Sequence, residues 1–380
     1  PDGTTIDFRQ PAEAIFAEHG ETIGRTLRSA LERDFRVISF GDAWYLEDQL
    51  EHFSKGRLNE IRRYILEEEA PLSDQTILSD LLFKNPRDPD YEMWAFSLNA
   101  RLLREKKEFE YVGVAGAHLW SVKGLPTIGS RLLKASDIGQ DYAFLLEEEE
   151  PLAGKMEQWE HFLTFYEYQH GVLPYDSLAR AFFPPPYLED QRAAYLRFEI
   201  PQHYEAYAVE LRYPSGNRGG WLWGLEDFFH NSLVPGALIV ISRTEEPNVF
   251  VLQYMVTEEQ ERRLLVLDER KNRYAFDEIT FYCAVEESML LSEERFRSLH
   301  NTAPLPPALR RRPADVVAQT FVRIGKKEGA RYRATLEALF VAVNIERPFS
   351  MAFLRRILDE NDVFSAAEEG VYYYEPGEES

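Results

Sequence analysis

The sequence contains little of what marks secreted, membrane or zinc-binding proteins. It has a single cysteine, Cys283, in 380 residues, which rules out an internal disulfide and a zinc site made of cysteines. No apolar run approaches the ~20 residues that a membrane-spanning helix needs, so we expect no membrane contact. Scarce cysteine fits a reducing compartment, and we predict a cytoplasmic protein. The chain opens with PDGTTIDFRQ and not with a basic and apolar leader, as expected of a trimmed or mature fragment.

The motifs of the common enzyme classes are also missing. The sequence has no phosphate-binding P-loop, no glycine-rich dinucleotide fingerprint, no HExxH pair and no G-x-S-x-G elbow. Glu167 and His170 lie three residues apart in an expected helix, but a two-metal carboxylate site needs more copies of that spacing. We therefore predict no enzyme, no cofactor and no bound metal, and we infer no small-molecule substrate.

One pair of residues leaves an enzymatic alternative open. Glu269 and Lys271 follow the apolar run LLVLD, in the spacing that nucleases use for a metal-binding carboxylate and a catalytic lysine. Such a site needs a second carboxylate on a neighbouring strand, and the spacing selects none among Asp268, Glu258 and Glu199. A charged turn between two strands is the favoured interpretation. A nuclease or restriction-type accessory protein is the less favoured one.

The charge of the chain is acidic overall and unevenly distributed. Acidic residues outnumber basic ones by 65 to 43, and the net charge of −22 argues against a protein that coats nucleic acid with its whole surface. It favours solubility and basic partner proteins. Residues 301–357 nevertheless hold eleven basic and four acidic side chains, a net charge of +7. We therefore expect any nucleic-acid contact chiefly in this stretch.

The sequence does have enough apolar surface for several cores. Apolar residues make up 44% of the chain and aromatic ones 13%, which excludes wholesale disorder. A chain of 380 residues is too long for one ordinary core, so we expect two to four domains.

Residues 109–124, FEYVGVAGAHLWSVKG, have the pattern of a β-hairpin, with two apolar stretches around a small-residue turn. Three helix-like segments precede them: RLNEIRRYILEEE; SDQTILSDLLF, with Ser73 as its expected cap; and YEMWAFSLNARLLREKK. Helix, helix, helix, hairpin is the order of a winged helix. We predict that this hairpin is a wing whose aromatic residues seal a three-helix core.

The hairpin pattern occurs three times, each time as a phenylalanine, a turn glycine and then bulky residues. The phenylalanines are Phe35, Phe109 and Phe364, the glycines are Gly41, Gly116 and Gly370, and the bulky residues include Trp44, Trp120 and Tyr373. We expect positive φ at each glycine and core positions for Trp44, Trp120 and Tyr373. The last copy also follows three helix-like segments, RPADVVAQTFVRIG, ARYRATLEALFVAV and FSMAFLRRILDEN. Three unrelated hairpins are the alternative.

The stretch 56–124 resembles the HARE-HTH winged-helix family, which includes the folded domain of the RNA polymerase delta subunit. The similarity rests on the helix after APLSDQTILSDLLF and on the ending KKEFEYVGVAGAHLWSVKG. A weaker similarity covers 313–376, and the segment KNPRDPDYE departs from the pattern. The resemblance implies association with nucleic acid or with the transcription machinery, and no catalytic activity.

From about residue 193 the apolar period changes from helical to alternating, in runs such as YLRFEIP, YEAYAVELRY, ALIVISR and VFVLQYMV. The predicted fold class is therefore α+β and multi-domain, with two or three winged-helix units flanking a β-rich barrel or sandwich-like domain. In chain order we predict an N-terminal winged-helix-like unit (1–52), a winged helix (55–126), an acidic connector (127–155), a helical segment (156–190), the β-rich domain (191–299), a proline- and arginine-rich linker (300–312) and a C-terminal winged-helix-like domain (313–376).

The predicted nucleic-acid contacts are basic side chains near the last helix of each winged-helix unit and in the linker, where they can meet phosphates or base edges. In the C-terminal part they are Arg310, Arg311, Arg312, Arg323, Lys326, Lys327, Arg331, Arg333, Arg355 and Arg356. In the first unit they are Arg101, Arg104, Lys106 and Lys107, near Asn99. A solvated helix face is the alternative for each group.

These observations predict a non-enzymatic, transcription- or DNA-associated winged-helix protein. Its basic C-terminal unit would contact DNA or RNA, and its acidic remainder would contact the transcription machinery or another protein. The alternative is an acidic protein–protein interaction scaffold whose winged helices bind no nucleic acid.

Overall fold

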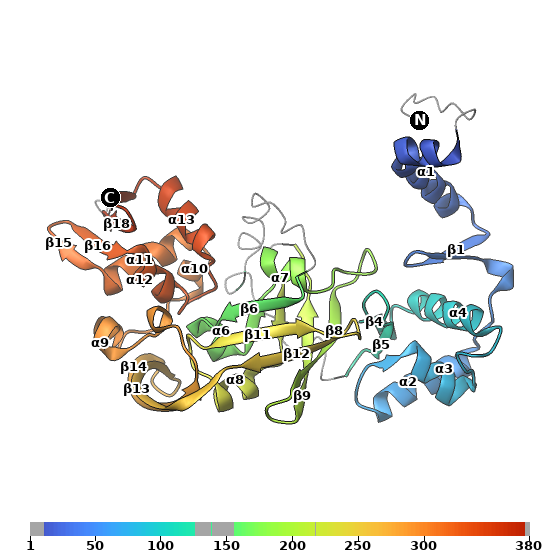
Figure 1. Ribbon diagram of the computed structural model, residues 1–380, viewed down its shortest axis with the longest axis horizontal. Helices are drawn as coiled ribbons and strands as arrows, with labels where there is room; N and C mark the ends of the chain where they lie inside the picture. Colours follow the sequence, from blue (N-terminus) through green and yellow to red (C-terminus); the bar gives the residue numbers. More distant parts are fainter. Residues whose placement is uncertain (1–10, 126–137, 139–155, 217, 377–380) are drawn as a thin grey trace. The chain divides into compact units, whose positions relative to one another are not determined.

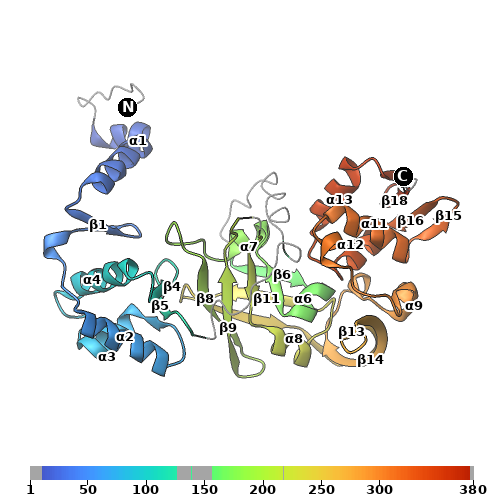
Figure 2. The same cartoon turned by 180° about the vertical axis from the view of Figure 1, so that it is seen from behind.

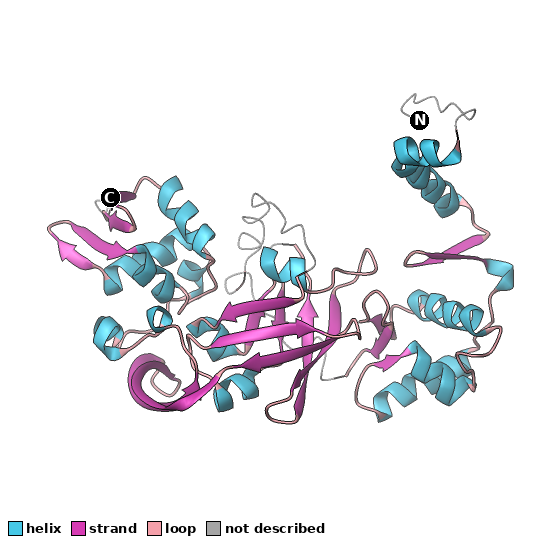
Figure 3. Ribbon diagram, viewed as in Figure 1, coloured by secondary structure: helices cyan, strands magenta, loops and turns pink. Residues whose placement is uncertain are grey.

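The computed structural model describes residues 11–125, 138, 156–216 and 218–376 (Figure 1). The chain divides into two compact units, one made of residues 1–110 with 120–125 and the other of 111–119 with 126–380. Both contain helices and strands, so the predicted α+β fold class is confirmed (Figure 3). The predicted acidic connector lies outside the described residues, except for Ile138. Among the helices described, none combines the length and apolarity that crossing a bilayer requires.

The first unit contains a winged helix in the order that the sequence predicts. Its three strands form a sheet of order β3-β5-β4. The elements are α2 (Lys55–Glu67), β3 (Leu72–Ser73), α3 (Asp74–Leu82), α4 (Tyr91–Arg104), β4 (Phe109–Tyr111) and β5 (Leu119–Val122). Ser73 caps α3, as predicted, because its hydroxyl accepts the N–H of Thr76. Trp120 is only 1% exposed, which confirms its place in the core.

The N-terminal hairpin belongs to this same core and does not close a winged helix of its own. Within the described residues a single helix, α1 (Ala12–Arg33), precedes β1 (Val37–Phe40) and β2 (Ala43–Leu46). Phe35 is 86% exposed, and Trp44 and Tyr373, which were expected in a core, are only half-buried. Phe40 is buried instead and stacks on Trp120, with 6.4 Å between ring centroids. The pattern of three hairpins is real, but the first copy is an extension of the first winged helix.

The three turn glycines adopt the predicted conformation. The φ angle is +56° at Gly41, +82° at Gly116 and +72° at Gly370. Residues with a Cβ rarely enter this region, so the shared sequence pattern corresponds to a shared turn geometry.

A curled sheet of seven strands, a half-barrel, forms the centre of the second unit (Figure 2). Its order is β6-β11-β12-β8-β9-β10-β7, with β6 (Gln158–Phe162), β7 (Val172–Pro174), β8 (Ala193–Ile200), β9 (Glu205–Arg212), β10 (Trp221–Trp223), β11 (Leu238–Arg243) and β12 (Val249–Tyr254). Residues 163–171 alone connect the two edge strands, β6 and β7. Because α6 (Phe165–His170) in that connection is only ~9 Å long, the edges must curl toward each other.

The segment 156–190 is therefore not only helical. The two predicted helices are present as α6 and α7 (Ser177–Phe182), but β6 and β7 flank α6 and join the sheet. β6 has five residues and β7 has three, too few for an alternating pattern to separate them from the helices beside them. Phe182 and Phe183 at the end of α7 pack in the half-barrel core with Trp159 of β6.

A long hairpin and several short helices follow the half-barrel. α8 (Glu226–Ser232) precedes β11, and β13 (Val256–Asp268) pairs with β14 (Arg273–Cys283) in a separate two-stranded sheet. The remaining elements up to the C-terminal unit are η2 (Glu287–Met289), α9 (Glu293–Phe296), η3 (Arg297–Leu299) and α10 (Pro307–Arg310).

The C-terminal segment repeats the winged-helix order with one added strand. Its elements are α11 (Pro313–Ile324), β15 (Lys326–Glu328), β16 (Arg331–Thr335), α12 (Leu336–Val343), α13 (Met351–Glu360), β17 (Phe364–Glu368) and β18 (Val371–Tyr374). The sheet order is β15-β16-β18-β17. The expected helix over ARYRATLEALFVAV begins only at Leu336, because residues 331–335 form β16 and Thr335 caps the helix.

Candidate nucleic-acid interface

α13 occupies the place of a recognition helix in the C-terminal winged helix. Phe353, Leu354, Ile357 and Leu358 are buried in the core, so the opposite face meets solvent. On the solvent side Arg355 is exposed. Arg356 forms an ion pair with Glu360 at 2.8 Å, and Asp359 is exposed beside it. Two acidic side chains therefore offset the two arginines on this helix.

Arg323 faces inward, in contrast to the prediction that it contacts nucleic acid. Its Nη1 lies 2.6 Å from Oε1 of Glu346, whose side chain is 1% exposed. The same carboxylate accepts the hydroxyl of Tyr274, and its Oε2 accepts the N–H of Leu305. Burial raises the pKa of Tyr274, and the charge of Glu346 raises it further. Arg323 neutralises a buried carboxylate and is not available to a phosphate.

The linker arginines have different surroundings. Arg310 ends α10, and its carbonyl accepts Nη1 of the fully buried Arg347 over 3.0 Å. Arg312 lies 3.7 Å from Asp315 in an exposed ion pair. Arg311 is exposed, and no carboxylate contacts it within the described residues. Of the three predicted linker contacts, Arg311 is the one best placed to meet a phosphate.

The hairpin of β15 and β16 gathers four of the predicted basic residues. Three of them have acidic partners: Lys326 with Glu328 at 3.6 Å, Arg331 with Glu375 at 3.1 Å and Arg333 with Glu368 at 2.6 Å. The ammonium of Lys327 lies 5.9 Å from the centre of the Tyr332 ring. Surface pairs contribute about 0–1 kcal/mol, so they do not fix these side chains firmly, but they remove most of the positive potential.

The net charge of the C-terminal part depends on which residues are counted. The residues after Ile357 bring six acids, Asp359, Glu360, Asp362, Glu368, Glu369 and Glu375, into the same fold. The net charge of residues 301–376 is therefore +1, compared with +7 for residues 301–357. The wing of this unit, β17 and β18 with the turn between them, carries two of these acids, Glu368 and Glu369. The folded unit is close to neutral.

In the first unit the helix in the recognition position is covered. Residues 96–100 of α4 are all buried. Tyr45 of the N-terminal hairpin packs on Phe96, with ring centroids 4.5 Å apart, and the N–H of Glu51 donates to the hydroxyl of Ser97. A helix wrapped in this way cannot enter a DNA groove.

The predicted contacts on α4 are occupied within the unit. Arg101 pairs with Glu105 at 2.6 Å, and Arg104 with Glu47 at 3.1 Å. Asn99 is buried, and its amide bonds to Asp74 and to the indole of Trp120. Lys106 and Lys107 are exposed just after α4. Glu105 lies one helical turn from Arg101, whereas the partner of Arg104 is 57 residues away and could not be inferred from local spacing.

The residues that lead into the tip of the first wing are packed. Residues 111–119 belong to the second compact unit. The N–H of Tyr195 in β8 donates to the carbonyl of Val112 over 2.8 Å, and the amide of Gln191 donates to the carbonyl of Gly113. Tyr111, His118 and Tyr187 form a ring cluster beside these bonds. The strands of this wing are therefore held in place, and Ala115 and Gly116 at its turn are exposed.

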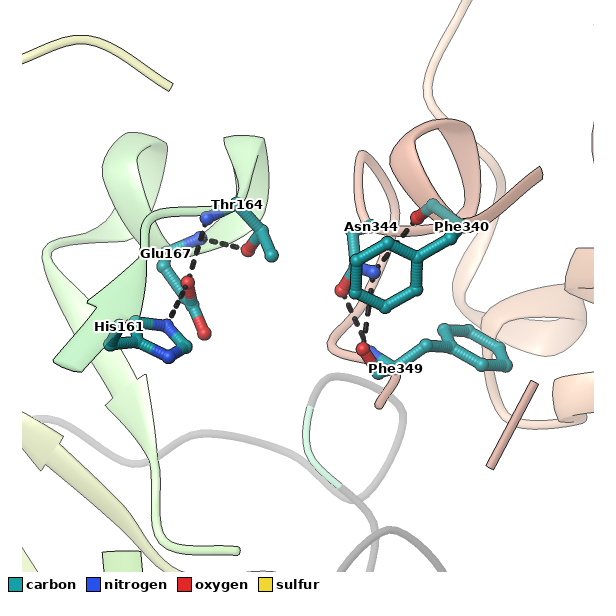
Figure 4. A network of polar contacts seen from close by, with 6 residues as sticks. All are labelled: His161, Thr164, Glu167, Phe340, Asn344 and Phe349. Atoms are coloured by element: carbon teal, nitrogen blue, oxygen red, sulfur yellow. Dashed lines mark hydrogen bonds and ion pairs between the residues drawn. The ribbon is translucent and has the colours of Figure 1, made fainter. Parts of the chain in front are cut away.

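A polar pair of the half-buried His161 and the buried Glu167 lies at the start of α6 (Figure 4). Nε2 of His161 is 2.8 Å from Oε2 of Glu167, and that oxygen also accepts the N–H of Thr164 in a capping box. Burial lowers the pKa of His161, but the charge and hydrogen bond of Glu167 outweigh burial, and the pKa is raised. Glu167 faces His161 rather than His170. Among the residues described, no three potential metal ligands gather at one place.

The segment around Lys271 is a charged turn, as the favoured interpretation held. Residues 269–272 join β13 to β14, and Asn272 has a positive φ of 50°. The ammonium of Lys271 lies 3.0 Å from the carboxylate of Asp268. That ion pair and the backbone bonds of the turn account for the spacing of charged residues without a metal.

Comparisons with known proteins identify no match for this chain, so its function is inferred from the sequence and the structure. No family model matches the chain, and neither a curated protein nor a solved structure shows similarity to it.

Proposed function

We propose that this protein is a non-enzymatic protein–protein interaction scaffold in which the winged helices serve as packing modules. The observation that carries the proposal is the burial of residues 96–100 of α4, where Tyr45 of the N-terminal hairpin packs on Phe96. A winged helix that reads DNA needs this helix exposed and basic. Here the helix completes a core, and its two arginines pair with carboxylates.

The charge of the chain supports the same function. A net charge of −22 repels the phosphate backbone and attracts basic protein surfaces. The resemblance of residues 56–124 to the HARE-HTH family fits a scaffold that meets its partners in the transcription machinery. We place the protein in the cytoplasm, where the single buried thiol of Cys283 stays reduced.

Nucleic-acid binding through the C-terminal unit is the second candidate. It is favoured by three exposed basic side chains, Arg311, Lys327 and Arg355, that no carboxylate contacts within the part of the chain that the structure describes. Three phosphate contacts would give a measurable but modest, salt-dependent affinity.

Titration of a labelled DNA duplex at several salt concentrations separates the two functions. The scaffold predicts no saturable binding at physiological salt and early elution from heparin. If the duplex binds, and the triple variant Arg311→Ala, Lys327→Ala, Arg355→Ala flattens the slope of log K against log salt by about 3, the second candidate is correct. Arg270→Ala, an exposed arginine in the turn after β13, is the matched control.

A further inference from the structure

The outer edge of β13 is unpaired along its first half. β13 and β14 form a sheet of only two strands, the curled hairpin of Figure 3. On its other side β13 meets residues 291–292 near its centre: Leu264 bridges to Ser292, and the N–H of Leu265 donates to the carbonyl of Leu291 over 2.9 Å. Along residues 256–263 the described chain places no strand on that side.

The register shows which backbone groups point outward along this edge. In an antiparallel ladder, alternate residues direct their N–H and C=O groups toward the partner strand and away from it. Leu265 pairs with Phe276, and its N–H points away from β14. Arg263 and Glu261 lie two and four residues before Leu265 in the regular part of the ladder. Their backbone N–H and C=O groups therefore also point away from β14. An open row of this kind is a template for an additional strand.

A cleft of about 540 Å³ lies beside the same edge. Arg262 and Arg263 line it from β13, and Ser292, Glu293, Glu294 and Arg297 line it from the segment around α9. The extended segment ends where α9 begins at Glu293, whose carboxylate pairs with Arg263 of β13. Leu291 and Ser292 pair with the outer edge of β13, and the cleft lies where an added strand would extend that pairing toward Val256.

The side chains along the edge specify the chemistry of the added strand. Residues 257–261, TEEQE, carry three glutamates, and the two arginines that follow, Arg262 and Arg263, pair with Glu287 and Glu293. Met255 and Val256, immediately before them, are 62% and 60% exposed. Opposite charges on facing strands attract, and apolar side chains on them pack together. A complementary strand carries lysine or arginine interspersed with apolar residues.

We propose that the outer edge of β13, residues 256–263, binds an extended basic segment of a partner protein by strand addition. Backbone hydrogen bonds to Glu261 and Arg263 hold the segment, the three glutamates select its charge, and Met255 and Val256 receive its apolar side chains. This inference rests on the proposed scaffold function and names its surface and its class of partner.

The test uses the whole chain and a labelled octapeptide of alternating lysine and valine. We expect saturable binding that weakens with salt, and none for the matching glutamate–valine peptide. Glu261→Pro removes one outward N–H and leaves the bonds to β14 in place. Glu261→Ala removes the same carboxylate but keeps the N–H. We expect the proline variant to bind the peptide about tenfold more weakly than the alanine variant.

Hydrogen exchange provides a second measurement that needs no variant. The bound peptide should slow exchange at the amides of Glu261 and Arg263. Equal affinity of the two variants, or absence of saturable binding, overturns the inference. Peptide binding that protects a different segment also overturns it and leaves the scaffold function standing. Duplex binding that depends on Arg311, Lys327 and Arg355 would instead contradict the scaffold function.

Discussion

The indole Nε1 of Trp120 donates to the amide oxygen of Asn99 over 2.6 Å in the core of the first unit. The amide nitrogen of Asn99 donates in turn to Oδ2 of Asp74, also over 2.6 Å. All three side chains are buried. These hydrogen bonds join the wing, α4 and α3. α4, the helix in the recognition position, therefore holds the core of this unit together.

Asn99→Leu should destabilise the first unit. The change leaves the indole N–H without its acceptor and Asp74 without one of its donors, and a buried polar group without its partner costs about 1–3 kcal/mol, more when it is charged. Urea unfolding of the variant should show a free-energy loss of about 2–4 kcal/mol. Gln75→Ala, at an exposed position of α3, is the control. Equal stability of the two variants would contradict the role given to Asn99.

Glu346→Gln should destabilise the C-terminal unit more than any surface charge change. Removing one partner of a buried ion pair leaves the other charge uncompensated and costs about 3–5 kcal/mol. Arg323→Ala should cost a similar amount, and the double variant should cost clearly less than the two single losses added together. Arg312→Ala, which breaks the exposed pair with Asp315, should change stability by less than about 1 kcal/mol. Additive losses in urea unfolding would show that Arg323 and Glu346 do not act together.

His161 should make stability depend on pH. Its pKa is raised in the folded state, so its contribution is fully present below the unfolded value of about 6.5 and is lost as the pH rises through the folded pKa. Glu167 and Asp176 are the charges that act on it. The difference in melting temperature between the wild type and His161→Gln should therefore shrink from about pH 5.5 to about pH 8.5. A difference that stays constant over this range would exclude the titration of His161.

Gly113→Ala should disturb the tip of the first wing. A Cβ at this position would lie 2.4 Å from the backbone nitrogen of Leu119 and 2.5 Å from the carbonyl oxygen of Ala117, so the backbone of the hairpin must shift. Hydrogen exchange at the amide of Tyr195, which bonds to Val112, should become faster. Gly20→Ala is the control, because nothing lies within 4 Å of a Cβ there and alanine is favoured over glycine in a helix. Unchanged exchange at Tyr195 in Gly113→Ala would argue against this packing.

Local sequence patterns predicted the parts of the fold that depend on local geometry. The cap at Ser73, the positive φ of Gly116 and the core position of Trp120 all follow from one residue and its near neighbours. β6 and β16 were missed because they are five residues long and stand beside helices with stronger apolar periods.

The candidate site was harder to predict, because neutralisation of charge is a property of the fold. Arg323 and Glu346 are 23 residues apart, and Arg333 and Glu368 are 35 apart. Their side chains meet only through the packing of α11 against α12 and the pairing within the last sheet. A count of charges along residues 301–357 contains no information about that pairing. Arg323 and Arg333 form contacts within the fold, and the sequence alone does not separate them from arginines that face solvent.

The edge position of β6 has a consequence for synthesis on the ribosome. β6 ends at Phe162, and its partner strand β11 begins at Leu238, about 75 residues later. At 5–20 residues per second, Trp159 and its neighbours leave the ribosome roughly 4–15 s before their partner strand exists. During that interval the backbone N–H and C=O groups of β6 lack the strand with which they pair in the folded protein. The half-barrel therefore closes late, and a chaperone that shields this short segment would act before β11 emerges.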